Sequence, residues 1–368
     1  MIRSVAPVSV VALLAGIGTA QADIVVGLGT ATSGSVAALG QQTVHGAQQA
    51  VKDINAQGGV LGQKLVLKVG DDACDPRQAV AVANRFATDK VVAVAGHLCS
   101  GSSIPASEVY NEEGVVMVTP TATNPTLTER GFGGVFRVCG RDDQQGVVSA
   151  GYIAGAYRGK NVAVVDDKQS YGKGLADVVA KNLEQAGVKV AFRGAVTAGE
   201  KDFTALVSNL KERNIDVVYY GGYHPELGLI VRQARELGLQ ARFVAGDGLN
   251  NPEFWAITGP AGEGTLFTDS ADAASSPAGR NMIATFQQAG LSEPGNFAFY
   301  SYAAVQIIAQ GLHQAGKADG KALAAALHAG SFDTVVGPIR FDRKGDNVSP
   351  NYVLYEWKDG RYAQVAGR

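Results

Sequence analysis

The chain has 368 residues, 34 acidic and 32 basic side chains, and a formal net charge of −2. A chain of this length exceeds what a single hydrophobic core usually holds, so two domains are expected. The near-neutral charge, without any block of basic residues, argues against nucleic acid or an anionic membrane surface as a partner.

The N-terminal residues predict a signal peptide. Arg3 supplies one positive charge, residues 5–17 are apolar, and Ala20-Gln21-Ala22 has the small-x-small pattern of a cleavage site. We therefore expect residues 1–22 to be removed after Ala22 and the mature protein to be periplasmic. No cysteine stands at the cleavage point, and no apolar run reaches the roughly 20 residues of a membrane span, so no membrane insertion is expected.

Strand and helix patterns alternate from residue 24 onward, which predicts an α/β fold with parallel sheets covered by helices on both faces. A first series of expected strands covers 24–28, 64–69, 91–95, 115–118 and 136–139, with helices at 43–54, 77–88 and 106–113. A second series has strands at 162–165, 188–192, 216–220, 242–245 and 265–268, with helices at 144–157, 174–186, 203–213 and 226–237. Residues 268–277 are expected to cross over to helices at 278–289, 299–315 and 321–329. The pattern ends with two strands, 337–342 and 352–357, predicted to pair around the charged turn 342–346.

Two strand-to-helix turns of the first series are rich in hydroxyl groups. Ser100 lies in the turn 96–105, and Thr123 lies in the turn 119–125. Strand ends on the same side of an open α/β sheet line one crevice, and free N–H groups at a helix start attract anions. These turns therefore predict a site for a carboxylate.

Several motifs together resemble one protein family. They are DDACDP at 71–76, GHLCS at 96–100, DKQSYG at 167–172, TAGEKDF at 197–203 and YYGGYHPE at 219–226. The chain is similar in these motifs to the periplasmic leucine/isoleucine/valine-binding proteins of ABC importers, and the resemblance covers almost the whole chain after the leader.

The resemblance implies a type I periplasmic-binding-protein (Venus-flytrap) fold with two Rossmann-like lobes and three crossings between them. Lobe one would be 23–141 plus 271–349, and lobe two 142–270 plus 350–368, closing on a ligand by a hinge. It also implies the function: to capture a branched-chain or other compact amino acid and deliver it to ABC permease subunits. No cofactor, metal or enzymatic activity is expected, and the protein is expected to be a monomer.

The two charges of an amino acid need partners when water is excluded. For the carboxylate, the residues offer the hydroxyl and N–H groups of Ser100 and Thr123, and the resemblance adds the backbone of Thr121. For the ammonium, Asp247 follows the strand at 242–245 and stands where relatives carry glutamate. The shorter acid leaves room for a ligand whose amine lies further from its carboxylate, so an ω-amino acid is the alternative ligand.

Aromatic and apolar residues are expected to enclose the rest of the ligand. Tyr171 and Tyr223 each follow a strand and a short polar turn of the second series, and they would cover the ligand on closure. Phe297 resembles a residue of the side-chain pocket. Leu39 falls where relatives carry an aromatic ring, which predicts a roomier aliphatic wall.

The chain has three cysteines, Cys74, Cys99 and Cys139. Export makes a disulfide plausible, and Cys74 and Cys99 follow strands of consecutive βα units, which we expect to be neighbours in the sheet. The family resemblance implies the same pair. Cys139 is then an apolar filler, and metal binding is disfavoured because no CxxC or HxxxH spacing occurs.

Other functions remain as alternatives. A Ser/Cys amidase would use Ser100 or Cys99 with His97, but no orienting acid stands out nearby in the sequence. Asp71, Asp72 and Asp75 are a candidate cation site, but the spacing lacks the glycine and terminal glutamate of a calcium loop, so a solvated helix start is expected there. Dinucleotide binding is improbable because Thr32 replaces the third glycine of the fingerprint. A ligand-sensing receptor of the same fold, without transport, is the third alternative.

Overall fold

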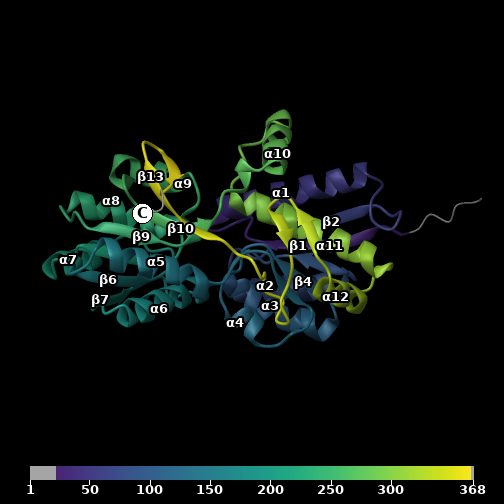
Figure 1. Cartoon of the computed structure of the whole chain (residues 1–368), viewed down its shortest axis with the longest axis horizontal. Helices are drawn as coiled ribbons and strands as arrows, with labels where there is room; N and C mark the ends of the chain where they lie inside the picture. The colour runs from purple at the N-terminus through teal and green to yellow at the C-terminus, as the bar shows by residue number, and fades with distance from the viewer. Residues whose placement is uncertain (1–21, 366–368) are drawn as a thin grey trace, which may run out of the picture.

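The computed structural model describes residues 22–365, which form two lobes side by side (Figure 1). The expected signal peptide, residues 1–22, lies outside this range except for its last residue. The first lobe contains a five-stranded sheet of order β2-β1-β3-β4-β5, and the second a seven-stranded sheet of order β14-β13-β10-β9-β8-β6-β7. The prediction of a two-lobed α/β fold is confirmed.

The first lobe is built on a parallel sheet. Its strands are β1 Ile24–Thr30, β2 Leu65–Asp71, β3 Ala93–Ala95, β4 Val116–Thr119 and β5 Val135–Arg137. Its helices are α1 Ala37–Ala56, α2 Pro76–Thr88, α3 Ser100–Glu113, α4 Thr126–Glu129, α10 Pro277–Gln288, α11 Asn296–Ala315 and α12 Gly320–Ala329. One apolar core packs α1 and α11 on one face, and a second packs α2 and α3 on the other. Burial on both faces explains why these strands are almost continuously apolar.

The second lobe repeats this architecture. Its strands are β6 Val162–Asp166, β7 Val190–Ala195, β8 Val217–Gly221, β9 Arg242–Ala245, β10 Leu266–Ser270, β13 Tyr352–Lys358 and β14 Arg361–Gln364. Its helices are α5 Asp142–Ala156, α6 Ser170–Gln185, α7 Thr204–Glu212, α8 His224–Glu236 and α9 Glu253–Thr258. Side chains alternate across the sheet, so that Tyr219 packs with α5 and α6 while Tyr220 packs with α7 and α8. Short 3₁₀ segments are Asp247–Leu249, Gly259–Gly262 and Ala273–Ser275.

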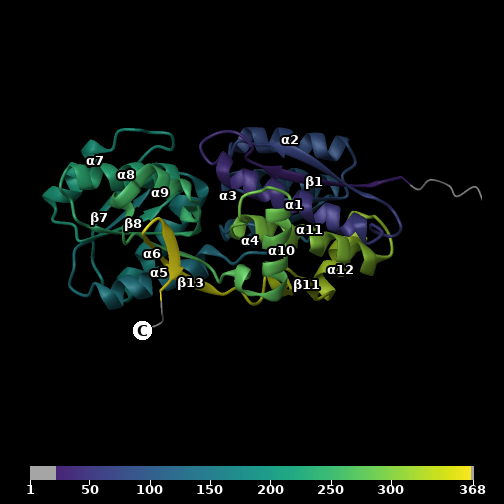
Figure 2. The ribbon, with the colours of Figure 1, turned by 90° about the horizontal axis from the view of Figure 1, so that it is seen from above.

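The chain passes between the lobes three times. It leaves the first sheet after β5, returns after β10 to build α10–α12 and the small β11–β12 sheet, and then sends β13 and β14 to the second sheet. Figure 2 shows the same division, with β13 in the lobe of α5–α9 and β11 beside α10–α12. No helix among residues 22–365 is long and apolar enough to cross a membrane.

The predicted C-terminal hairpin is wrong. β12 (Gly337–Ile339) pairs with β11 (Phe332–Thr334), whereas β13 pairs with β10 and β14. Between β12 and β13, an isolated antiparallel bridge joins Phe341 to Asn347, and Asp346 bridges to Arg137. The charged turn 342–346 therefore closes this short bridge but does not pair β12 with β13. It lies at the third passage between the lobes, and the apolar residues of β13 are buried against the second lobe.

Several helices begin earlier than the sequence predicts. α3 starts at Ser100 and contains Pro105, α1 starts at Ala37, and α6 starts at Ser170. These first turns are rich in serine, glycine and glutamine, which favour a loop by composition. The first N–H groups of a helix need no partner within it, so such residues are compatible with a first helical turn.

The predicted disulfide is present between Cys74 and Cys99, with Cα atoms 5.6 Å apart, and Cys139 is buried. The expected reason was wrong in one respect. β1 lies between β2 and β3, so the cysteines do not follow neighbouring strands. Both lie beyond the strand ends, where the loops meet past the end of β1.

Candidate functional site

A small cavity lies between the two lobes. It has about 210 Å³ of empty space and is lined by Leu98, Ser100, Thr121 and Phe297 of the first lobe and by Tyr171, Tyr223, Asp247 and Gly248 of the second. The structure thus brings six of the eight predicted ligand-binding residues together around one cavity. A water-sized sphere has only about 10 Å³ of room there, so the walls lie close together.

The first-lobe wall presents the start of a helix. Ser100 is the first residue of α3 and only 1% exposed, and its Oγ accepts a hydrogen bond from the Asn124 N–H at 3.2 Å. The Thr121 hydroxyl donates to the Leu98 carbonyl at 2.9 Å, so the proton of this hydroxyl is already engaged within the first lobe. The helix N-terminus favours an anion on this side.

The second-lobe wall presents a fixed carboxylate. Asp247, 8% exposed, accepts hydrogen bonds at Oδ1 from the Tyr171 hydroxyl at 2.7 Å and from Gln145 Nε2 at 3.0 Å. The Gly248 N–H donates to the Tyr171 oxygen at 3.0 Å and so orients that hydroxyl. Burial raises the pKa of Asp247, and the bonds from Tyr171 and Gln145 oppose that shift. A bound cation would stabilise the ionised form.

Aromatic rings close the remaining sides. The rings of Tyr171 and Tyr223 lie 5.0 Å apart between centroids at an interplanar angle of 40°. Phe297, from the start of α11, and Leu98 add apolar surface from the opposite lobe. The cavity therefore has an anion-attracting end, a cation-attracting end and an apolar enclosure, which matches a small zwitterion with an aliphatic side chain.

Two predicted residues are not on the cavity wall. Leu39 is fully buried behind it, in an apolar cluster that also contains Leu98, Tyr223 and Phe297. Thr123 is fully buried as well, and its hydroxyl has no hydrogen-bond partner among residues 22–365. Leu39 thus supports the wall from behind rather than forming it.

Sequence reasoning missed Leu98, Gly248 and Gln145. Leu98 and Gly248 adjoin predicted residues, Cys99 and Asp247. Gln145 follows the start of α5 by one turn and reaches across to fix the Asp247 carboxylate. The only indication of this role in the sequence is that Gln145 lies three residues after Asp142, on the same face of the helix.

The lobes touch at the mouth of the site. Asn124 of the first lobe donates through Nδ2 to the carbonyl of Ser170, the first residue of α6, at 2.6 Å. A side chain on Gly174 would collide with the Asn124 amide, so glycine permits this close approach. The structure is therefore that of closed lobes.

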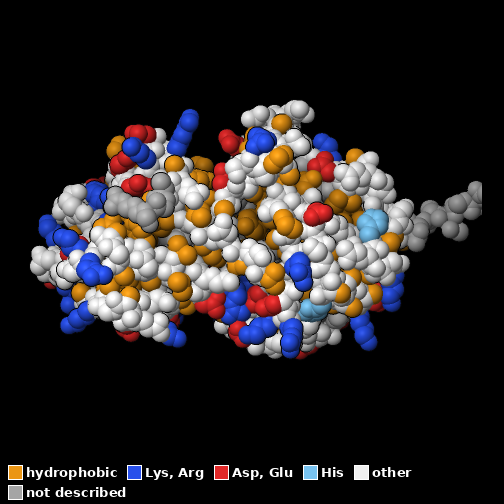
Figure 3. Space-filling model, in the orientation of Figure 1, with side chains coloured by type: hydrophobic (Ala, Val, Ile, Leu, Met, Phe, Trp, Pro, Cys, Tyr) orange, Lys and Arg blue, Asp and Glu red, His pale blue; other side chains and the backbone are white. Residues whose placement is uncertain are grey.

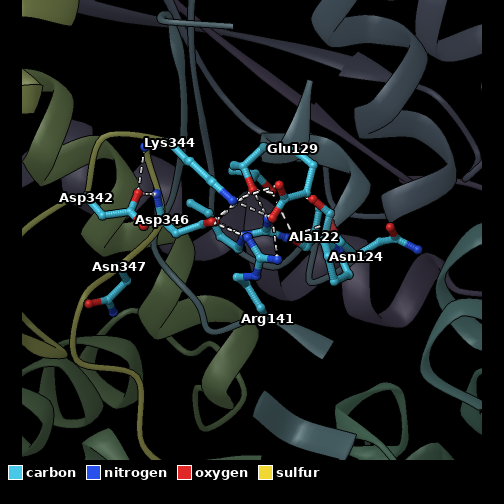
Figure 4. Close-up of polar contacts among 12 residues, drawn as sticks. Ala122, Asn124, Glu129, Arg141, Asp342, Lys344, Asp346 and Asn347 are labelled. Atoms are coloured by element: carbon cyan, nitrogen blue, oxygen red, sulfur yellow. Dashed lines mark hydrogen bonds and ion pairs between the residues drawn. The ribbon is translucent and has the colours of Figure 1, made fainter. Parts of the chain in front are cut away.

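A group of ion pairs joins two of the passages between the lobes (Figure 4). This hinge network consists of Thr128, Glu129, Arg137, Arg141, Lys344 and Asp346. Arg137, completely buried, donates to Asp346 at 2.8 Å and to the carbonyls of Ala122 and Asn124, and Arg141 reaches the other Asp346 oxygen at 2.7 Å. The network fastens the first passage, at Arg141, to the third, at Asp346.

The His97 ring faces away from the cavity. Its Nδ1 lies 2.5 Å from Asp72 and its Nε2 lies 2.7 Å from the Tyr110 hydroxyl, all three residues being fully buried. The expectation of a solvated Asp72 is therefore wrong, and the orienting acid that the sequence did not reveal is Asp72. Both ring nitrogens are engaged away from Ser100, and Cys99 is oxidised, so this histidine is not placed as a base for either residue.

Charged side chains of both signs are dispersed over the surface. On the face shown in Figure 3, acidic and basic groups occur together on both lobes. Among residues 22–365, no three His, Cys, Asp or Glu side chains are grouped to hold a metal ion.

A cavity between two α/β lobes, walled by polar and aromatic side chains of both, is typical of a two-lobed ligand-binding protein. The chain belongs to the periplasmic binding protein family, whose model matches residues 23–361. It is 45% identical over 362 residues to Leu/Ile/Val-binding protein homolog 1 of Brucella melitensis, covering 97% of both chains. It is 46% identical to the leucine-, isoleucine-, valine-, threonine- and alanine-binding protein of Pseudomonas aeruginosa, covering 87% of this chain and 86% of that one. The resemblance inferred from the sequence motifs is confirmed.

Solved structures show the same fold. A leucine-binding protein of Thermotoga maritima superimposes with a TM-score of 0.87 at 30% identity, covering 93% of this chain and 98% of that one. A branched-chain amino acid transporter substrate-binding protein of Streptococcus pneumoniae, in complex with isoleucine, gives a TM-score of 0.84 at 26% identity, covering 94% and 99%.

Proposed function

We propose that this protein is the substrate-binding protein of an ABC importer and captures a compact aliphatic amino acid, of branched-chain size or smaller, between its lobes. The observation that carries the proposal is the cavity in which the Asp247 carboxylate faces the start of α3 at Ser100. The names of the relatives support the ligand class, since they include leucine, isoleucine, valine, threonine and alanine.

The first-lobe residues would receive the ligand carboxylate. Ser100 would contribute its hydroxyl and N–H, Thr121 its backbone, and Thr123 its hydroxyl from the layer behind. These groups can replace water around a carboxylate without a full positive charge, as anion sites at helix starts do. Phe297, supported by Leu39, would contact the ligand side chain.

The second-lobe residues would receive the ammonium and close the site. Asp247 would pair with the ammonium, and Tyr171 and Tyr223 would cover it with their rings. Because the ligand touches both lobes only when they are closed, binding shifts the population toward the closed form. We place the lobe boundaries at 141/142, 270/271 and 349/350, so that the hinge network lies beside two of the three crossings.

An ω-amino acid is the second candidate ligand. Asp247 accepts hydrogen bonds from Gln145 of α5 and Tyr171 of α6, and an aspartate is one methylene shorter than the glutamate expected from the family. The shorter acid would lengthen the span between the carboxylate site and the ammonium site. A ligand with its amine further along the chain would fill that span.

The remaining steps follow from the family. We propose that the chain is exported by a signal peptide cleaved after Ala22, works as a monomer in the periplasm, and delivers its ligand to membrane permease subunits. A sensing role without transport uses the same closure, and flanking permease and ATPase genes would favour transport. Mass spectrometry of the mature N-terminus tests the cleavage site.

The central test is a thermal-shift panel of α-amino and ω-amino acids, followed by calorimetric titration of the best ligand. Asp247→Asn should weaken that ligand at least ~30-fold, or about 2 kcal/mol, because a buried ammonium loses its countercharge. Asp216→Asn, a half-exposed acid of the second lobe, is the matched control and should leave affinity unchanged. A loss below threefold for Asp247→Asn would remove Asp247 from the site.

The amidase alternative has a separate test. Aminoacyl amides and esters should be stable in the presence of the protein. Turnover that disappears in Ser100→Ala would establish an enzyme instead, since only a nucleophilic Ser100 predicts that result.

A further inference from the structure

A cluster of unsatisfied polar groups lies in the second layer of the candidate site. This inner polar cluster consists of Thr123, Asp142, Gln145, Tyr219 and Tyr352. Its buried side-chain atoms without a hydrogen-bond partner among residues 22–365 are Thr123 Oγ1, Asp142 Oδ1 and Oδ2, Gln145 Oε1, Tyr219 OH and Tyr352 OH. Unpartnered buried polar atoms are rare in folded proteins, so their accumulation beside a ligand cavity needs an explanation.

Asp142 is the most demanding member. It is the first residue of α5 and completely buried, and neither carboxyl oxygen has a partner among the described residues. Its N–H donates to the Thr123 carbonyl at 2.9 Å, which keeps the two residues adjacent. Gln145, one turn further along the same helix, bonds to Asp247 and so connects the cluster to the cavity wall.

The charges around Asp142 do not balance if it is ionised. Burial and the neighbouring Asp247 carboxylate both raise the pKa of Asp142, while the Thr123 hydroxyl, which lies close by but outside hydrogen-bond geometry, and Arg137 lower it. The Arg137 guanidinium donates instead to Asp346, Thr128 and two backbone carbonyls. The proposed ligand brings one ammonium, which one carboxylate, Asp247, neutralises. A second buried charge would remain without compensation.

We propose that Asp142 is a neutral carboxylic acid in the binding-competent protein and acts as a positioning residue, donating its O–H to Thr123 Oγ1 so that the Thr123 hydroxyl donates toward the ligand carboxylate. This inference deepens the proposed function and rests on it. The direction of the hydroxyl is the central point. An ionised Asp142 would instead accept a hydrogen bond from the Thr123 hydroxyl, and the oxygen lone pairs of Thr123 would then face an anionic ligand.

Thr123 is suited to transmit this effect. The next residue, Asn124, donates its N–H to the Ser100 hydroxyl and its side-chain amide to Ser170 of the other lobe. The order of the Thr123–Asn124 segment therefore bears on both the carboxylate end of the cavity and the contact that closes the lobes. Gly174 leaves the backbone of α6 close enough for that contact.

The proposal predicts a specific pH dependence. Ligand affinity should fall as the pH rises through the titration of Asp142, because ionisation reverses the Thr123 hydroxyl. Affinity should also fall at low pH, because Asp247 must be ionised to hold the ammonium and is protonated there. The other titratable or charged groups that act on Asp142 or on this cluster are Arg137, Cys139, Asp143, Tyr171, Tyr219, Tyr223, Tyr352 and Asp269.

The experiment is calorimetric titration of the best amino acid from the thermal-shift panel, between pH 5 and 9, with wild type, Asp142→Asn and Asp142→Ala. Asn is isosteric, and its amide donates to Thr123 at every pH. Asp142→Asn should therefore bind within threefold of the wild type near neutral pH and should lack the alkaline decline that belongs to Asp142. Asp142→Ala should bind at least tenfold more weakly throughout, since nothing orients the hydroxyl.

Two further readouts make the result decisive. Infrared difference spectra should show a protonated carboxyl band that Asp142→Asn removes. Thr123→Val should weaken binding, and combining it with Asp142→Ala should add little, since both act through one hydroxyl. Asp142→Asn that binds as poorly as Asp142→Ala, or that keeps the wild-type alkaline decline, would overturn the proposal. If no amino acid binds the wild type at all, the proposed function fails instead.

Discussion

The hinge network and the inner polar cluster are both buried polar regions, but they are built in opposite ways. In the hinge network, Asp346 receives Arg137 and Arg141 on its two oxygens at 2.8 and 2.7 Å. Burial opposes its ionisation, yet these partners lower the pKa of Asp346. In the inner polar cluster, burial raises the pKa of Asp142, whose oxygens have no partner among the described residues.

The hinge network therefore has a structural role, whereas the inner polar cluster bears on ligand binding. A charge with every hydrogen bond satisfied fixes one geometry and holds two chain passages together. A charge left without its complement is unstable in the empty protein, and it becomes favourable only when a ligand or a proton supplies what is missing. The inner polar cluster lies beside the cavity, so a bound ligand can supply the missing hydrogen-bond or charge partners.

Breaking the hinge network should have the largest effect on stability. Arg137→Met should lower the free energy of unfolding by about 3–5 kcal/mol, because it leaves Asp346 buried without its main partner. Urea denaturation measures this change. The double variant Arg137→Met/Asp346→Leu should recover most of the loss, and a single-variant loss below ~1 kcal/mol would contradict the assignment.

The disulfide tests whether the cavity wall is anchored independently of the hinge. Cys74 and Cys99 are 25 residues apart, and reopening a loop of this size should cost about 3 kcal/mol of unfolding free energy. Reduction should therefore lower the melting temperature, and the cost should add to that of Arg137→Met because the sites are separate. An unchanged melting temperature on reduction would mean that the bond contributes nothing.

Neutralising the buried acid of the cavity wall, next to the inner polar cluster, should have the opposite sign. Because the folded-state pKa values of Asp142 and Asp247 are raised, the folded protein retains protons that the unfolded chain releases above pH ~4. The free energy of unfolding without ligand should thus decline as pH rises from that point. Asp247→Asn should flatten this decline and stabilise the empty protein near neutral pH, because it removes a buried carboxyl whose pKa is raised. A steeper decline in thermal melts would contradict the comparison.

The exposed edge of the hinge network should matter least. Lys344 pairs with Glu129 at 2.7 Å, but both side chains are about half exposed. Lys344→Ala should leave the melting temperature unchanged within error at ordinary salt, because exposed ion pairs are screened. A clear destabilisation would show that the turn 342–346 is held by this pair rather than by Asp346.

Sequence patterns predicted most strands and helices because their apolar periodicity is strong. They failed where composition and tertiary contact disagree, as at Ser100, where a serine- and glycine-rich turn is the first turn of α3. The pairing of β13 could not be predicted locally, since its partner β10 lies about 85 residues earlier and the intervening chain belongs to the other lobe. Of the site, residues at strand ends were found, whereas Gln145 and Asp142 act from a helix face that carries no motif.

The interlaced order of the strands has a consequence for how the protein is made. The second sheet receives β13 and β14 only from the last part of the chain, after α10–α12 have been added to the first lobe. Neither lobe is one continuous segment, so truncation before β13 would leave an open sheet edge at β10. Both lobes are therefore complete only when nearly the whole chain is available, and the second sheet gains its last two strands from the C-terminal end.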